Sequence, residues 1–257
     1  MILNYKAYNY NKSETILILH GLLGSNRNWA SIAKQLPYRV LCFDLRNHGD
    51  SGHDPDMRYD TQAQDVADTI ASLYPKIIPP VRAIVGHSMG GKVALQLAYN
   101  TPEIVKQLII VDSVPKAYAP GRHQHLFAAC LKLPLDMIQT RTQADAHLQA
   151  AVPDASLRAF LLQNLRLNPT RWRVPLRLLQ DNDKIIMGMP PWQHPLATPT
   201  AFIYGHSSDY MNESDYPLIR EKIKAPRFYP MPGSHWLHAE YPDLFLENLQ
   251  LAISLVE

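Results

Sequence analysis

Six short apolar runs, separated by segments of helical periodicity, constrain the fold of this chain more than any other feature of its sequence. They lie at residues 15–20, 39–45, 81–87, 106–113, 199–205 and 227–233. Apolar residues in these runs are continuous rather than alternating, which is typical of strands whose two faces are both covered. The pattern therefore predicts an α/β fold of the doubly wound kind, in which helices flank a mostly parallel sheet.

Segments of helical periodicity lie between these runs and at the end of the chain, at residues 28–36, 61–74, 92–100 and 248–257. From about 114 to 195 the sequence contains no convincing strand, only helical segments separated by prolines. A helical insertion at the carboxyl side of a parallel sheet is placed to cover the crevice where ligands bind. We therefore predict a core of residues 1–113 and 196–257 and a helical cap of residues 114–195, inserted before the penultimate strand.

Composition and charge are those of an ordinary globular protein. The chain is 46% hydrophobic and 19% charged, as in globular proteins, and its net charge of +2 gives no reason to predict nucleic acid or a membrane as partner. Cys42 and Cys130 are too few for a disulfide framework and have no metal-ligand spacing. No signal peptide or transmembrane run is evident. We predict a soluble, cytoplasmic monomer or small homo-oligomer without metal or cofactor.

The stretch IVGHSMGGK, residues 84–92, joins a predicted strand to a predicted helix at Ser88. Gly86 and Gly90 flank the serine and allow a sharp turn that projects its side chain above the sheet edge. A Gly-x-Ser-x-Gly pattern also occurs by chance, so this stretch alone leaves open whether Ser88 is a nucleophile or an ordinary loop serine. Acyl transfer by a serine further needs a base, an acid that orients the base, and donors for the oxyanion.

The stretch LILHGLLGS, residues 17–25, is the candidate for the oxyanion donors. After His20 and Gly21, the backbone N–H of Leu22 is expected to point into the space above the sheet. The second donor is expected to be the N–H of Met89, which opens a helix whose dipole favours negative charge. An ordinary turn from strand to loop would explain the His-Gly pair equally well.

Among the 11 histidines, His235 is the candidate base. It lies on a loop between the last predicted strand and the final helix, at the crevice of the sheet. His238 is nearer to the helix start and is expected to cap or pack, and His87 is expected to be a packed, hydrogen-bonded core residue. His123 and His125 have no third ligand at a spacing that a metal could use.

Two aspartates compete for the role of orienting the base. Asp112 ends the run LIIVDS, and Asp209 follows the run FIYG, so both are expected near the carboxyl edge of the sheet. Other aspartates, such as Asp65 and Asp68 in a predicted helix, are expected to be solvated surface charges. The order Ser, Asp, His along the chain is therefore the informative feature.

This order, with HG in the first loop, GHSMGG at 86–91 and GSHW at 233–236, resembles the α/β-hydrolase superfamily. The stretches DLRNHGDSG, VDSVP, GRHQHLF and SHWLHAEYPD are similar to those of its YbfF-type esterases, small cytoplasmic serine hydrolases with a helical cap that cleave acyl esters, with acyl-CoA thioesters among their proposed substrates. The resemblance implies an α/β-hydrolase fold, Ser88 as nucleophile, His235 as base, and backbone donors at Leu22 and Met89.

One position departs from the commonest pattern of that superfamily. The acid usually stands three residues after the glycine that ends the penultimate strand, and here Gly205 plus three is Ser208. Asp209 is therefore out of phase by one residue. This favours Asp112 as the acid, with Ser208 as an auxiliary hydrogen-bond partner of the His-Asp pair, as the resemblance to the subgroup implies.

The predicted cap is more basic than the rest of the chain. Between Ser113 and Pro195 there are ten Lys or Arg and five Asp, a net charge of +5. A solvated helical surface explains this excess, but Arg122 near the crevice mouth is also a candidate to bind an anionic group of the substrate, such as a carboxylate or a CoA phosphate. Arg46 and His48 are better explained as parts of a folded loop.

The sequence therefore predicts a serine hydrolase that cleaves small-molecule acyl esters, or acyl-CoA thioesters, through an acyl-enzyme. Fold and triad do not select the leaving group, so a carbon–carbon bond hydrolase or a lyase is an alternative. A non-catalytic binding protein with the hydrolase fold is an alternative of a different class.

Overall fold

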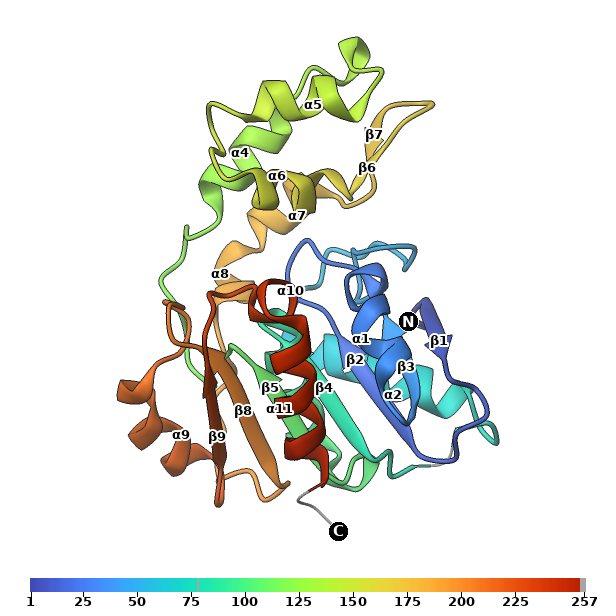
Figure 1. Cartoon of the computed structure of the whole chain (residues 1–257), viewed down its shortest axis with the longest axis vertical. Coiled ribbons are helices and arrows are strands. Elements are labelled where there is room, and N and C mark those ends of the chain that lie inside the picture. The colour runs from blue at the N-terminus through green and yellow to red at the C-terminus, as the bar shows by residue number, and fades with distance from the viewer. Residues whose placement is uncertain (78, 255–257) are drawn as a thin grey trace.

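A seven-stranded sheet forms the centre of the computed structural model, which describes residues 1–77 and 79–254 (Figure 1). In spatial order the strands are β1 (Tyr5–Tyr8), β3 (Arg39–Phe43), β2 (Thr15–Leu19), β4 (Ala83–His87), β5 (Leu108–Val111), β8 (Thr200–Gly205) and β9 (Arg227–Met231). β1 pairs antiparallel with β3, and the other neighbours are parallel. The predicted mostly parallel sheet is confirmed.

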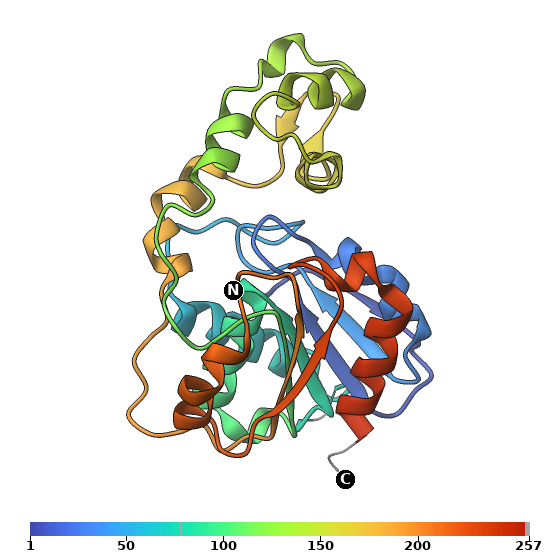
Figure 2. The ribbon, with the colours of Figure 1, turned by 60° about the vertical axis from the view of Figure 1, so that its left-hand side comes forward.

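Helices cover both faces of this sheet (Figures 1 and 2). The core helices are α1 (Ala30–Gln35), α2 (Tyr59–Ser72), α3 (Met89–Asn100), α9 (Tyr216–Lys222), α10 (Leu237–Glu240) and α11 (Pro242–Ser254), with short 3-10 turns η1 (Asn26–Trp29), η2 (Pro102–Ile104) and η4 (Glu213–Asp215). In β2, Ile16 and Ile18 pack with α1 and α11 on one face, whereas Leu17 and Leu19 pack with α2 and α3 on the other. Every residue of the strand is therefore buried, which explains its continuous apolar run.

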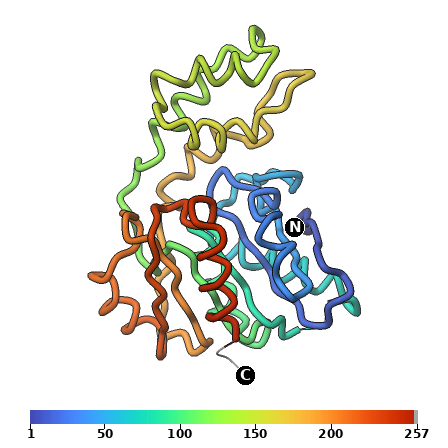
Figure 3. The backbone as a smooth tube through the Cα atoms, in the orientation of Figure 1, coloured from blue at the N-terminus to red at the C-terminus, as the bar shows by residue number. Residues whose placement is uncertain are grey.

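Between β5 and β8 the chain leaves the sheet and forms a separate lobe beyond its carboxyl edge, which we call the cap lobe (Figures 1 and 3). It contains α4 (Gln124–Leu131), η3 (Leu135–Met137), α5 (Arg141–Leu148), α6 (Ala155–Leu162), β6 (Leu165–Arg166), β7 (Arg171–Trp172), α7 (Leu176–Asp181) and α8 (Asp183–Met187). The β6–β7 hairpin lies where no strand was predicted. Its strands have two residues each, too few to produce a recognisable pattern.

The two connections of the cap lobe are held together beside α3. The backbone N–H of Tyr118, in the outgoing connection, donates to the carbonyl of Met187 in the returning one at 2.8 Å. Lys92 of α3 is only 2% exposed, and its Nζ donates to the carbonyls of Met187 at 2.9 Å and Gly188 at 2.6 Å. These bonds fix the base of the lobe to the helix that follows Ser88.

On its other side the cap lobe contacts the loops that follow β2 and β3. Nδ2 of Asn28 donates to Oε1 of Gln163 at 2.8 Å, and Asp50 forms ion pairs with Arg166 and Arg173. The lobe is thus attached to the core at two separated places. Among the described helices, none is both long enough and apolar enough to cross a bilayer.

The prediction that Asp65 is a solvated surface charge is wrong. Asp65 of α2 is 2% exposed and accepts a hydrogen bond from Nε of the equally buried Arg46 at 2.6 Å. A buried carboxylate is tolerated because its charge is paired. Arg46 is therefore part of the folded loop after β3, as expected from the sequence.

Candidate active site

Ser88 lies on the sharp turn between β4 and α3. Its backbone has φ 52° and ψ −117°, a strained conformation, and its N–H continues the sheet ladder by donating to the carbonyl of Val111 at 3.0 Å. A Cβ on Gly86 would collide with the backbone of Gly90, and a Cβ on Gly90 with the backbone of Leu19. Only glycine fits at these two positions, so the predicted strand–turn–helix at Ser88 is present for a steric reason.

A buried carboxylate and an imidazole meet beside this turn. Nδ1 of His235 lies 2.6 Å from Oδ2 of Asp112, which is 0% exposed. The same oxygen accepts a hydrogen bond from Oγ of Ser208 at 2.5 Å. Asp112 follows β5 directly, and its N–H donates to Ile203 of β8 at 2.9 Å. The structure thus brings together His235, Asp112 and Ser208 from three loops at the carboxyl edge of the sheet.

Asp209, the competing acid, lies elsewhere. Its side chain is 78% exposed and forms an ion pair with Arg122. Ser208, one residue earlier, is the residue whose side chain reaches Asp112. The one-residue phase difference noted in the sequence therefore directs Asp209 towards solvent and the cap lobe instead of towards His235.

Burial disfavours a charge on either member of the Asp112–His235 pair. Desolvation raises the pKa of Asp112, an effect that the hydrogen bond from Ser208 opposes, and it lowers the pKa of His235. The imidazole of His235 is therefore neutral near pH 7. A neutral imidazole whose Nδ1 donates to a carboxylate has Nε2 available to accept a proton.

Ser88 and His235 line one cavity of about 370 Å³, at the junction of the core and the cap lobe. Tyr210 also lines it, with its ring stacked on the imidazole of His235 at a centroid distance of 3.7 Å. The guanidinium of Arg122 lies over the Tyr210 ring, 4.0 Å from its centroid. Arg122 therefore lies at the cavity as expected, but it is already paired with Asp209.

The loop after β2 passes directly beside Ser88. A Cβ built on Gly21 would lie 3.2 Å from Cβ of Ser88, so the backbone approaches the hydroxyl-bearing residue as closely as glycine permits. Within the described part of the chain, the N–H groups of Leu22 and Met89 have no hydrogen-bond acceptor. Two backbone donors are thus free on the chain segments that flank Ser88.

Three other histidines near the site have structural contacts. His87 is buried, and its Nε2 donates to the backbone carbonyl of His235 at 2.9 Å. His238 is buried and stacks on Trp29 at 4.5 Å between centroids. Nε2 of His123 lies 2.8 Å from the hydroxyl of Tyr210. Among residues 1–77 and 79–254, no group of three or more His, Cys, Asp or Glu side chains could hold a metal ion.

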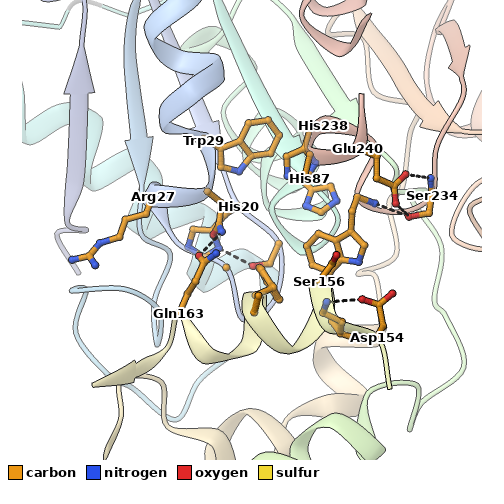
Figure 4. A pocket seen from close by; sticks show the side chains of 18 residues that line it. His20, Arg27, Trp29, His87, Asp154, Ser156, Gln163, Ser234, His238 and Glu240 are labelled. Carbon is orange, nitrogen blue, oxygen red and sulfur yellow. Dashed lines mark hydrogen bonds between the residues drawn. The ribbon is translucent and has the colours of Figure 1, made fainter. Parts of the chain in front are cut away.

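Figure 4 shows the lining of a second cavity, of about 690 Å³, which shares several lining residues with the first. Helix α6 of the cap lobe contributes Leu157 and Phe160 to the lining of both cavities. The core contributes Gly21, His87 and Trp236 to both. The rings of Phe160 and Trp236 lie 4.4 Å apart between centroids and form part of the wall that the cavities share.

Sequence reasoning missed the aromatic residues of these cavities. Tyr210, Phe160 and Trp236 belong to three separate segments, and each is an unremarkable aromatic residue in its local pattern. For Tyr210 and Trp236, the sequence offers one indication of a place in the site: they directly follow Asp209 and His235. For Phe160, in the middle of α6, the sequence contains no signal of a contact with the core.

Comparisons with known proteins concern the chain as a whole. The model of the Alpha/beta hydrolase family matches residues 16–248. The mouse (Mus musculus) sn-1-specific diacylglycerol lipase ABHD11 is 37% identical over 90% of this chain and 78% of its own length, and the esterase YbfF of Escherichia coli (strain K12) is 32% identical over 95% and 94%. The solved structure of a marine microorganism esterase, 33% identical, superposes with a TM-score of 0.91 over 97% of this chain and 98% of that one.

Proposed function

The chain belongs to the alpha/beta hydrolase family and is similar to the esterase YbfF, and from this we propose that it is an ester hydrolase in which Ser88 is the nucleophile. Relatives named esterase and diacylglycerol lipase support ester hydrolysis as the activity. In the proposed mechanism His235 is the base, Asp112 orients it and Ser208 supports the pair.

The reaction proceeds in two halves. Nε2 of His235 takes the proton of Ser88 as Oγ attacks the ester carbonyl, and the carbonyl oxygen becomes an oxyanion that the N–H groups of Leu22 and Met89 stabilise. His235 then gives the proton to the leaving alcohol, which departs and leaves an acyl group on Ser88. A water molecule then attacks the acyl carbon while His235 takes one of its protons. The bond between the acyl carbon and Oγ of Ser88 breaks, His235 returns the proton to Oγ, and the carboxylic acid is released.

The 2.6 Å contact between His235 and Asp112, beside the strained turn of Ser88, is the observation that carries the proposal. A fluorophosphonate probe tests it, because the probe reacts with an activated serine and not with an ordinary hydroxyl. We expect labelling of Ser88, mapped by mass spectrometry, and no labelling after heat denaturation. Absence of labelling in the folded protein would favour a non-catalytic binding protein.

The natural leaving group is a separate part of the proposal. The two adjoining cavities, of about 370 and 690 Å³, have room for a substrate larger than a short-chain ester. We propose acyl esters as the main class and acyl-CoA thioesters as a second class, since both are cleaved by the same steps. Hydrolysis of p-nitrophenyl esters of graded chain length and of acyl-CoAs, assayed side by side, measures the preference. Activity on neither would favour carbon–carbon bond cleavage or lyase chemistry.

Arg122 is proposed to attract an anionic group of the substrate. We expect Arg122→Ala to raise KM at least about tenfold for a p-nitrophenyl hemisuccinate or an acyl-CoA, because a hydrogen bond to a charged group contributes about 1.5–3 kcal/mol. KM for the uncharged p-nitrophenyl butyrate should change much less. Steady-state kinetics with the three substrates provide the measurement.

Arg122 also stacks on Tyr210, so the loss of its ring contact must be separated from the loss of its charge. Arg122→Lys retains the charge and removes the planar group, and it should keep most of the preference for the anionic substrates. Equal increases of KM for anionic and neutral esters in Arg122→Ala would contradict anion binding.

A further inference from the structure

The loop that follows β2 is fixed at three successive peptide groups, and each is held by a different side chain. We call residues 21–24 the oxyanion loop, because it contains the proposed donor Leu22. The peptides between residues 21 and 22, 22 and 23, and 23 and 24 are contacted by His20, His48 and Asn164 respectively. His20 and His48 belong to the core, whereas Asn164 belongs to the cap lobe.

His20 holds the first of these peptides. Its Nε2 accepts a hydrogen bond from the N–H of Leu45 at 3.0 Å, so Nδ1 carries the proton and donates to the carbonyl of Gly21 at 2.7 Å. The N–H of Gly24 donates to the same carbonyl at 3.0 Å. In a trans peptide the C=O and N–H point in opposite directions, so fixing the carbonyl of Gly21 directs the N–H of Leu22. Figure 4 shows His20 at the cavity wall.

His48 holds the second peptide. It is fully buried, and its Nδ1 donates to the carbonyl of Arg46 at 2.8 Å, which leaves Nε2 to accept the N–H of Leu23 at 3.0 Å. Burial lowers the pKa of both His20 and His48, so both rings are neutral and keep these roles at neutral pH. Leu23 has φ 60°, a conformation that a leucine adopts only when its surroundings impose it.

Asn164 holds the third peptide from the cap lobe. Its Nδ2 donates to the carbonyl of Leu23 at 2.6 Å, and the residue is 4% exposed. The backbone of Asn164 is itself fixed inside the lobe, since its N–H donates to Leu161 at the end of α6 and its carbonyl accepts from the N–H of Arg173 across the β6–β7 hairpin. Movement of the lobe would therefore break or displace the contact with the strained residue Leu23.

Asn164 holds the peptide between Leu23 and Gly24, and the N–H of that peptide donates to the carbonyl of Gly21. We propose that Asn164 is therefore a positioning residue for the oxyanion hole: together with His20 it fixes the carbonyl of Gly21, so that the position of the cap lobe influences the direction of the Leu22 N–H. The inference rests on the proposed function, because it requires that Leu22 donates to an oxyanion. It assigns the lobe a second role besides forming the cavity wall. Formation of an efficient oxyanion hole then depends on the position of the lobe, even for a substrate too small to touch it.

Asn164→Asp and Asn164→Ala test this proposal with p-nitrophenyl acetate, a small neutral ester. The aspartate keeps the shape of asparagine but sets an oxygen against the carbonyl of Leu23, and the alanine only removes the donor. Since a misplacement of about 1 Å can cost about 100-fold, we expect kcat to fall about 10- to 100-fold in Asn164→Asp and less in Asn164→Ala, with KM within about threefold of wild type. Affinity for an alkylboronic acid, which forms a tetrahedral adduct on Ser88, should fall in parallel with kcat/KM.

Asn182→Asp is the matched control. It removes an Nδ2 donor to a backbone carbonyl, that of Leu178 at 2.9 Å, within the same lobe but away from the oxyanion loop. We expect its kcat to stay near wild type, and thermal unfolding of all variants corrects the rates for the folded fraction. A wild-type kcat in both folded Asn164 variants, an equal loss in Asn182→Asp, or a raised KM with unchanged kcat would each overturn the proposal. Failure of the proposed function is a different result, since the wild-type protein would then hydrolyse no ester.

Discussion

Ser88→Ala is expected to lower kcat for a short p-nitrophenyl ester by about 10⁴-fold or more while the protein remains folded. The residue occupies the strained turn between β4 and α3, beside the Asp112–His235 pair. Without its Oγ no acyl-enzyme can form, and only the residual effect of binding and of the oxyanion donors remains. The measurement is kcat of the purified variant, together with loss of fluorophosphonate labelling.

Ser31→Ala, in the exposed part of α1, is the control for the loss of a serine hydroxyl and should behave as wild type. Alanine at position 88 has the same backbone strain as serine, because both carry a Cβ at φ 52°. The substitution should therefore leave the fold intact, which circular dichroism and thermal unfolding can verify. A folded Ser88→Ala variant with more than about a tenth of wild-type activity would exclude Ser88 as the nucleophile.

Asp112→Asn is expected to have the next largest effect, a loss in kcat of about 10³- to 10⁴-fold. Asparagine keeps the shape of the side chain but removes the charge that stabilises the imidazolium of His235 and selects its tautomer. Oδ2 of Asp112 is the shared acceptor of His235 and Ser208, so the substitution affects both contacts. Steady-state kinetics of the folded variant measure the loss.

Three further variants rank the groups around the acid. Asp209→Asn should cost about tenfold or less, since its carboxylate is exposed and pairs with Arg122. Ser208→Ala should have an intermediate effect, because its hydroxyl donates to Asp112, and Ser207→Ala, whose side chain is exposed, should have none. A nearly inactive Asp209→Asn with a mild Asp112→Asn would move the acid to the loop after β8.

The sheet could be predicted because both of its faces are covered. The inner strands β2, β4 and β5 are buried along their whole length and consist mostly of apolar residues, so each of them appears in the sequence as a short apolar run. The edge strand β1 (Tyr5–Tyr8) was missed, since only half of its four residues are buried and the run contains a lysine. Two-residue strands such as β6 and β7 leave no pattern at all.

Those residues of the candidate site that lie just after a strand could be predicted from the sequence. Ser88, Asp112 and His235 each follow a strand of a parallel sheet, and the carboxyl ends of such strands meet at one edge. Contacts between distant segments leave no local signal. The pairing of Asp65 with Arg46 and the bond of Asn164 to the carbonyl of Leu23 depend on how helices and lobe pack, which residue spacing does not encode.

The cap lobe departs from the sheet after β5 and returns at β8, and these two strands are neighbours that pair in parallel. The segment between these two strands therefore does not alter the hydrogen-bond ladder that Leu108–Val111 forms with β8. The lobe is modular in this sense: an insert of another length or fold could replace it while the register of the core is kept. Substrate preference can then diversify by exchange of one segment, under the constraint that each new insert supplies its own support for the carbonyl of Leu23.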